Sequence, residues 1–124
     1  MIGLLALLLV VASPVIVNAD PEQQATIDHA WEAVLDTYDV EDCAVSLKVK
    51  VVAPTKPWAG RYFPAGQISP RAKIKIRSDY VFYEILIHEY GHHLWLECLT
   101  DNQRDTWGDA EWWAEAVVAG IADP

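Results

Sequence analysis

The residues best suited to chemistry in this chain stand in one short run, His88-Glu89-Tyr90-Gly91-His92. Its pattern is H-E-x-x-H, and two histidines four residues apart on a helix point the same way, so both imidazoles can reach one Zn²⁺. Glu89 would lie beside the metal's open position without ligating it. There a carboxylate can take a proton from metal-bound water and pass it to a leaving amine. The run predicts a zinc site with ligands His88 and His92 and general base Glu89.

The surroundings of this run strengthen the prediction. The segment from Tyr80 to Cys98 is apolar almost all round, which indicates a long helix in the middle of the fold, capped by Ser78 or Asp79. Burying two histidines and a glutamate in such a helix costs several kcal/mol unless a partner such as a metal satisfies them. The plainer alternative is a helix whose two histidines are hydrogen-bonded and hold no metal.

A zinc site with two histidines needs a third protein ligand, and no histidine follows His93. Glu111 and Glu115 lie four residues apart on the last expected helix and share one of its faces, so either could reach the metal if that helix packs antiparallel to the first. The connecting segment offers three aspartates as further candidates: Asp101, Asp105 and Asp109. Cys43 is another, because Glu41-Asp42-Cys43-Ala44-Val45-Ser46 faintly resembles the metal-binding E-G-C-L-S motif of peptide deformylases.

From Ile87 to about Ala119 the chain resembles the gluzincin peptidases, in which a downstream helix supplies a glutamate ligand. Around the metal site it is similar to the catalytic domain of anthrax lethal factor, whose ligand helix has a comparable E-aromatic-aromatic-A-E-A run, here Glu111 to Ala116. The resemblance implies a zincin-like fold, Glu111 as third ligand, and Glu115 as the partner that orients His88 through the far nitrogen of its ring.

The chain departs from that pattern at Arg104, which stands where the lethal-factor domain has a catalytic tyrosine. The group that would stabilise the developing oxyanion is therefore unassigned. Five residues are candidates for it: Arg104, Tyr62, Tyr80, Tyr83 and His93.

The elements expected around the site give an α+β order of helix, strands, buried helix and helix. Helical spacing of apolar residues predicts a first helix over Glu22 to Tyr38. Alternating apolar and basic residues predict strands over Ala44 to Val52 and Ala72 to Arg77, separated by a long loop rich in proline and glycine. A polar connection over Thr100 to Gly108 and a last helix from Asp109 to about Ile121 complete the order.

The second strand would line the cleft as the edge of the sheet. An extended substrate could pair with it by β-addition, with Lys73, Ile74, Lys75 and Ile76 as substrate-binding residues. The basic side chains of both strands would line the outer face of the sheet. A solvated face accounts for them; a surface for an acidic substrate or polymer is the alternative.

The N-terminal segment carries a targeting pattern. Residues Met1 to Val17 have no charged side chain, and the small residues Val17 and Ala19 precede Asp20. This predicts a signal peptide over residues 1–19, cleaved after Ala19, and a secreted or extracytoplasmic domain over residues 20–124. If it is not cleaved, the segment would be an N-terminal membrane anchor. In an exported chain Cys43 and Cys98 are expected to form a disulfide, with two free thiols as the alternative.

Together these patterns predict a zinc metalloendopeptidase that binds one Zn²⁺ per chain and acts on peptides or proteins. A net charge of −9 over 124 residues disfavours a nucleic acid as partner. The alternative is a zinc-binding module of zincin fold that recognises a peptide, or acts as a toxin-like domain, without hydrolysis. In either case zinc affinity should fall below a pH of about 6.5, because ligation needs neutral imidazoles.

Overall fold

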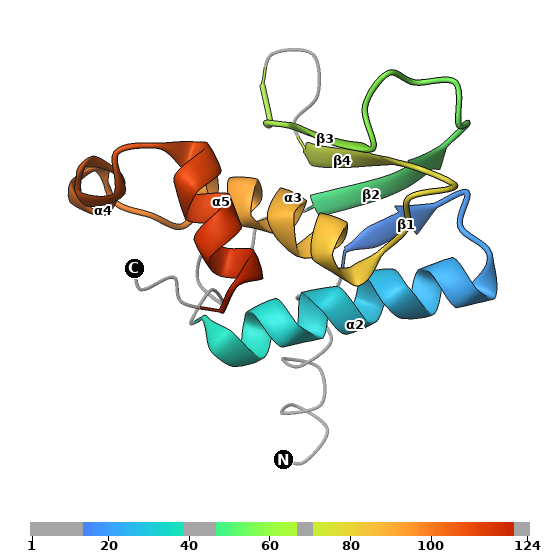
Figure 1. Ribbon diagram of the computed structural model, residues 1–124, viewed down its shortest axis with the longest axis horizontal. Helices are drawn as coiled ribbons and strands as arrows, with labels where there is room; N and C mark the ends of the chain where they lie inside the picture. Colours follow the sequence, from blue (N-terminus) through green and yellow to red (C-terminus); the bar gives the residue numbers. More distant parts are fainter. Residues whose placement is uncertain (1–13, 39–46, 67–70, 121–124) are drawn as a thin grey trace.

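A four-stranded sheet forms one layer of the protein, and helices cover one of its faces (Figure 1). The structure is a computed structural model that describes residues 14–38, 47–66 and 71–120. The strands are β1 (Val15–Val17), β2 (Leu47–Val52), β3 (Gly60–Phe63) and β4 (Ala72–Arg77), in the spatial order β1-β2-β4-β3. β1, β2 and β4 run parallel, and β3 is antiparallel to β4.

Strict alternation of side chains fixes the two faces of the central strands. The inner residues of β2 and β4 are buried, while the intervening residues are half-buried on the other face. Four of those outward residues are lysines, and like-charge repulsion contributes, after desolvation, to lowering the pKa of Lys75. The expected basic outer face is confirmed.

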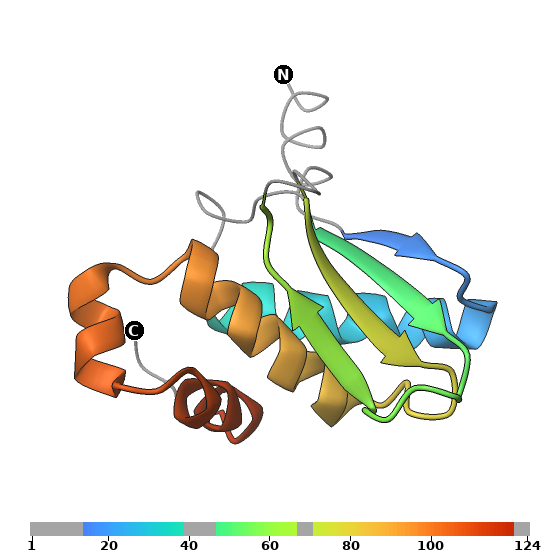
Figure 2. The same ribbon diagram turned by 90° about the horizontal axis from the view of Figure 1, so that it is seen from above.

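The inner face of the sheet packs against two long helices, α2 (Pro21–Thr37) and α3 (Tyr83–Glu97), as Figure 2 shows from above. α2 matches the first expected helix to within a residue at each end. Asp20 begins it, because the Asp20 side chain accepts a hydrogen bond from the Gln23 amide while the Gln23 side chain accepts one from the Asp20 amide. The prediction of an α+β fold is confirmed.

The start of α3 differs from the prediction. The helix begins after Phe82, and neither Ser78 nor Asp79 caps it. Instead the carboxylate of Asp79 accepts two hydrogen bonds from Arg77, at 2.8 and 3.1 Å, and the amide of Tyr80 bonds to the carbonyl of Arg77. The turn that ends β4 therefore uses the residues that would have capped an earlier helix start.

The segment expected to be a polar connection contains a short helix, α4 (Asp101–Trp107). Thr100 caps it together with Gln103, and Gly108 ends it with a φ of 78°, a left-handed conformation that glycine adopts without strain. The last helix, α5 (Ala110–Val118), follows at once and is capped by Asp109. It packs beside α3.

The prediction that residues 73–77 form an edge strand is wrong. β4 is hydrogen-bonded to β2 on one side and to β3 on the other, so no peptide can pair with it. The edge next to α3 belongs to β3, which lies inside the stretch expected to be a loop. The substrate-binding role given to Lys73, Ile74, Lys75 and Ile76 loses its structural basis with that edge.

The signal peptide and the disulfide between Cys43 and Cys98 are two predictions that the structure leaves untested. β1 lies within the expected signal peptide, pairs with β2, and packs Ile16 against the core. In the described part of the chain, the helices are too short or too polar to cross a bilayer. The expected disulfide involves Cys43, which lies outside the described residues, as do residues 44–46 of the first expected strand.

Candidate metal centre

His88 and His92 project from the same side of α3, one turn apart, with their ring centroids 5.0 Å from each other. Both rings are partly shielded, with exposed side-chain fractions of 28% and 17%. Burial lowers the pKa of His92, although nearby Glu111 opposes that effect. The net effect favours a neutral imidazole, which is the form that binds a metal.

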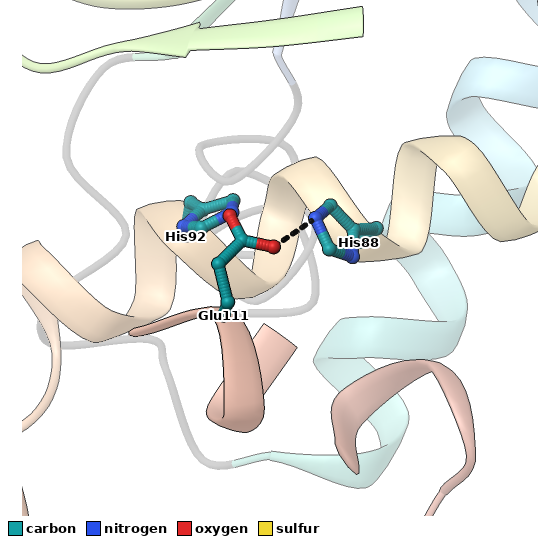
Figure 3. A group of neighbouring side chains, drawn as sticks. All are labelled: His88, His92 and Glu111. Carbon is teal, nitrogen blue, oxygen red and sulfur yellow. Dashed lines mark ion pairs between the residues drawn. The ribbon is translucent and has the colours of Figure 1, made fainter. Parts of the chain in front are cut away.

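Glu111 lies across both histidines, as Figure 3 shows. One carboxylate oxygen of Glu111 is 2.7 Å from Nε2 of His92, and the other is 3.2 Å from Nε2 of His88. Ligand atoms bound to a tetrahedral zinc at 2.0–2.1 Å are about 3.3 Å apart. One ligand atom from each of the three side chains lies within 4.8 Å of the others, so a small adjustment would fit them to the ion.

Close contact between α3 and α5 brings Glu111 to this position. A Cβ on Gly91 would lie 2.9 Å from the Cα of Ala114 and 3.2 Å from its Cβ, distances that would force the two helices apart. The indole nitrogen of Trp113 also donates a hydrogen bond to the carbonyl of Gly91, at 3.0 Å. Because Glu111 lies on α5 one turn before Ala114, this contact fixes it over the histidines.

Two more contacts hold α3 in the fold. The buried hydroxyl of Tyr90 donates to the carbonyl of Ile27 on α2, at 3.1 Å. One turn further along α3, the Tyr62 hydroxyl of β3 is hydrogen-bonded to Nδ1 of His93, at 3.0 Å. α3 is thereby tied to both the helical layer and the sheet edge, which leaves its metal-facing side well defined.

Glu89 faces away from the helical core toward β3. Only 6% of the residue is exposed, and its Oε2 atom is buried without a hydrogen-bond partner. Burial, with a smaller effect of Glu111, raises the pKa of Glu89 to about 7. A carboxyl group with that pKa near neutral pH can both accept and return a proton.

A cavity of about 570 Å³ opens beside His88 and Glu89. Its other polar walls are Glu84 and Glu115. Its apolar walls come from the start of β3 with the residue before it, from α3 and from α5: Ala59, Gly60, Ile85 and Val118. A Cβ on Gly60 would lie 3.3–3.4 Å from Ile85 and Glu89, so glycine keeps this wall of the cavity open. The cavity is therefore a space in which a ligand could meet the candidate base.

The structure separates the candidates for the third ligand. Glu111 contacts both histidines, whereas Glu115 is exposed and forms no hydrogen bond with His88 in the described part of the chain. Its expected role in orienting His88 stays a prediction. Asp109 caps α5 and Asp101 pairs with Arg104, so both carboxylates have structural partners. Cys43 lies outside the described residues.

None of the five candidates for stabilising an oxyanion lines the cavity. Arg104 donates to the carbonyls of Trp95 and Leu96 at the end of α3. Tyr62 and His93 bond to each other. Tyr83 stacks on His29 and Tyr80 packs on Phe82, both away from the cavity.

Five lining residues were not anticipated from the sequence: Ala59, Gly60, Glu84, Ile85 and Val118. A signal was present for three of them. Glu84 and Ile85 precede His88 and Glu89 by four residues, and Val118 follows Glu111 by seven, so each shares a helix face with a predicted site residue. Ala59 and Gly60 had no comparable signal, because the strand that begins at Gly60 was not expected.

Comparison with known proteins identifies no relative of this chain. No family model matches the chain, and neither a curated protein nor a solved structure matches it.

Proposed function

We propose that this protein is a zinc-dependent peptidase that hydrolyses peptide bonds. The observation that carries the proposal is the joint placement of two groups. The carboxylate of Glu111, on α5, lies across His88 and His92 of α3. The α3 turn that carries the two histidines also carries Glu89, which is buried, has an Oε2 without a partner, and lines a cavity. Burying a carboxylate without a partner beside His88, His92 and Glu111 costs stability, which is unexpected for a helix with a structural role alone.

Each residue has a defined task in this proposal. His88, His92 and Glu111 would hold one Zn²⁺, which supplies a Lewis acid and lowers the pKa of a bound water. Glu89 would take a proton from water as the water oxygen bonds to the peptide carbonyl carbon. It would return that proton to the nitrogen of the amine that leaves when the C–N bond breaks, with the carboxylic acid as the other product. In the metal-free protein burial raises the pKa of Glu89, so its carboxylate readily accepts a proton there.

The free edge of β3 would align an extended substrate. The amide of Arg77 donates to the carbonyl of Ala59, and pairing partners alternate along an antiparallel ladder. The backbone groups of Gly60 and Tyr62 therefore point away from β4, toward the open side. A peptide pairing there would pass the cavity wall formed by Gly60.

This arrangement supports a zincin-like interpretation of the fold. It has an antiparallel edge strand beside the H-E-x-x-H helix and a glutamate on the following helix, as the resemblance to gluzincins implies. Secretion after cleavage at Ala19, with a membrane anchor as the alternative, remains part of the proposal. So does a peptide or protein substrate rather than a nucleic acid.

One observation favours a second function, a zinc-binding module that recognises peptides without cleaving them. The described residues place no side-chain donor for an oxyanion in the cavity. Such a donor is worth about 10²–10³ in turnover, so its absence would leave a complete metal site with weak or no hydrolysis.

The test compares the wild type with Glu89→Gln on an unbiased peptide library, with zinc content measured for both. We expect Glu89→Gln to keep one zinc per chain and to lose about 10²–10⁴ in turnover, the usual share of general acid–base catalysis. Glu97→Gln is the matched control on the same helix, since Glu97 lies outside the cavity. Zinc-loaded wild type that cleaves no peptide would favour the binding module instead.

A further inference from the structure

The charged side chains that line the cavity beside Glu89 are acidic. Two exposed carboxylates, Glu84 on α3 and Glu115 on α5, stand on its walls, and none of its described lining residues is a lysine or arginine. The basic residues of the sheet lie on the outer face, with the sheet itself between them and the helices. Within the described residues, the negative charge of this cavity is therefore not neutralised by a neighbouring cation.

The apolar part of the wall complements these carboxylates. Ile85 and Val118 face the same space from α3 and α5, and Gly60 leaves room between them and the sheet edge. The cavity thus offers apolar contacts together with carboxylates. Glu89 also lines the cavity although only 6% of the residue is exposed, and its buried Oε2 has no hydrogen-bond partner, so a carboxyl group left unpaired by the fold stands in this wall.

We propose that this cavity is a specificity pocket for a basic side chain, lysine or arginine, adjacent to the bond that the protein cleaves. The inference rests on the proposed peptidase function. The aliphatic stem of such a residue would pack on Ile85 and Val118, and its cationic head would pair with Glu84 and Glu115. An apolar side chain would use the same walls but would take water from two unpaired carboxylates, which is unfavourable.

A bound zinc ion does not cancel this preference. Glu111, whose carboxylate lies against both histidines, would offset part of the charge of such an ion. Glu84 is not among the side chains whose ligand atoms come together at the candidate metal centre, which leaves its carboxylate available to the pocket. An acidic side chain would meet two like charges, so peptides with aspartate or glutamate at this position are expected to be the poorest substrates.

The test uses pairs of peptides that differ at one position only, lysine in one and norleucine in the other, scanned along both sides of the cleaved bond. Norleucine keeps the stem and lacks the ammonium group. At one position the wild type should prefer lysine by about tenfold in kcat/KM, which corresponds to about 1.4 kcal/mol. The preference should fall by at least about threefold in Glu84→Gln and in Glu115→Gln, and vanish in the double variant.

Glu32→Gln is the control, because Glu32 is exposed on α2 and lines none of this cavity. It should keep the full preference. Equal or better cleavage of the norleucine peptide at every position, or an unchanged preference in the double variant, would overturn the proposal. Zinc content is measured in each variant, and the ratio between paired peptides cancels any change in metal loading.

Failure of the peptidase function would be recognisable separately. If no peptide is cleaved, the same pairs are titrated against Glu89→Gln loaded with zinc, and the ratio of their Kd values replaces the ratio of kcat/KM. A lysine preference that depends on Glu84 and Glu115 would then support the pocket although hydrolysis is absent. Equal Kd values for both peptides would reject the pocket whatever the outcome for hydrolysis.

Discussion

Glu89 has to satisfy two opposing requirements. As a base it needs a free lone pair in a site shielded from bulk water, and the structure gives it both, with one buried oxygen left without a partner. The same placement makes its ionised form unfavourable, so burial raises its pKa from the ordinary 4.5 to about 7. Its contribution to folding therefore depends on pH.

In the metal-free protein this carboxyl group should reduce stability as the pH rises. The unfolded chain releases the proton near pH 4.5, whereas the folded chain holds it to about pH 7. Between these values the folded state binds more protons, so the free energy of unfolding falls with rising pH. The total loss from this group is on the order of 3 kcal/mol and is complete above pH 7.

Glu89→Gln should remove that loss. We expect the zinc-free variant to be more stable than the zinc-free wild type at pH 8, by about 1–3 kcal/mol, and to differ much less at pH 4.5. Urea unfolding at the two pH values measures it, with Glu97→Gln as control. A stability difference that is the same at both values would contradict the raised pKa.

At this scale the sequence predicts part of the site directly. His88, Glu89 and His92 follow from their spacing, because i, i+4 neighbours on a helix always share a face. The choice between Glu111 and Glu115 does not follow, since it depends on how far α5 is shifted along α3. That shift is set by the contact between Gly91 and Ala114, which no local pattern reveals.

The pairing of α3 with α5 is the element-level feature on which the site depends. Gly91 is in the middle of a helix, where alanine would normally be more favourable by about 0.8–1.0 kcal/mol. Here the added methyl group would meet backbone, at 2.9 Å from the Cα of Ala114. Overpacking of this kind costs typically 1–3 kcal/mol, which exceeds the gain in helix propensity.

Gly91→Ala should therefore lower stability, by about 1 kcal/mol or more, and should weaken zinc binding because Glu111 moves with α5. Thermal unfolding and zinc titration of the same variant measure both effects. Gly66→Ala is the matched control, since a Cβ there meets nothing within 4 Å and should cause no loss. If Gly91→Ala proved more stable than the wild type with unchanged zinc affinity, the contact would not be what positions Glu111.

The sequence predicts two of the strands, β2 and β4, but not the edge strand β3. Alternation identified β2 and β4 with their faces, because each has three buried residues in register. β3 spans only four residues between prolines and has no run long enough to show alternation. Its position at the edge is a product of pairing with β4, which is a tertiary event.

At the scale of the whole molecule, charge is divided between two sides. The protein carries a net charge of −9, yet the face of its sheet opposite the helices is basic. The acidic cavity and the candidate metal centre lie on the helical side, where α3 and α5 meet. A basic peptide approaching the protein is therefore attracted to the side that carries the site.

β1 connects the N-terminal segment to this architecture. Three residues of β1 pair with β2, and Ile16 and Ala19 pack against the core. A chain that begins at Asp20 should unfold more readily than one that begins at Pro14, by about 1–3 kcal/mol, since it loses this burial and exposes an edge of β2. Equal unfolding midpoints for the two chains would show that β1 contributes nothing to the fold.

The proposed function requires that His88, His92 and Glu111 hold one zinc ion. Zinc titration of the metal-free protein at neutral pH tests it most directly, with the wild type, Glu111→Gln and Glu115→Gln measured side by side. We predict one zinc per chain in the wild type and more than about 100-fold weaker binding in Glu111→Gln, because even partners of ligands contribute 10–100-fold. Glu115→Gln should retain stoichiometric zinc. A wild type that binds no stoichiometric zinc, or a Glu111→Gln variant that binds it as tightly, would contradict the account.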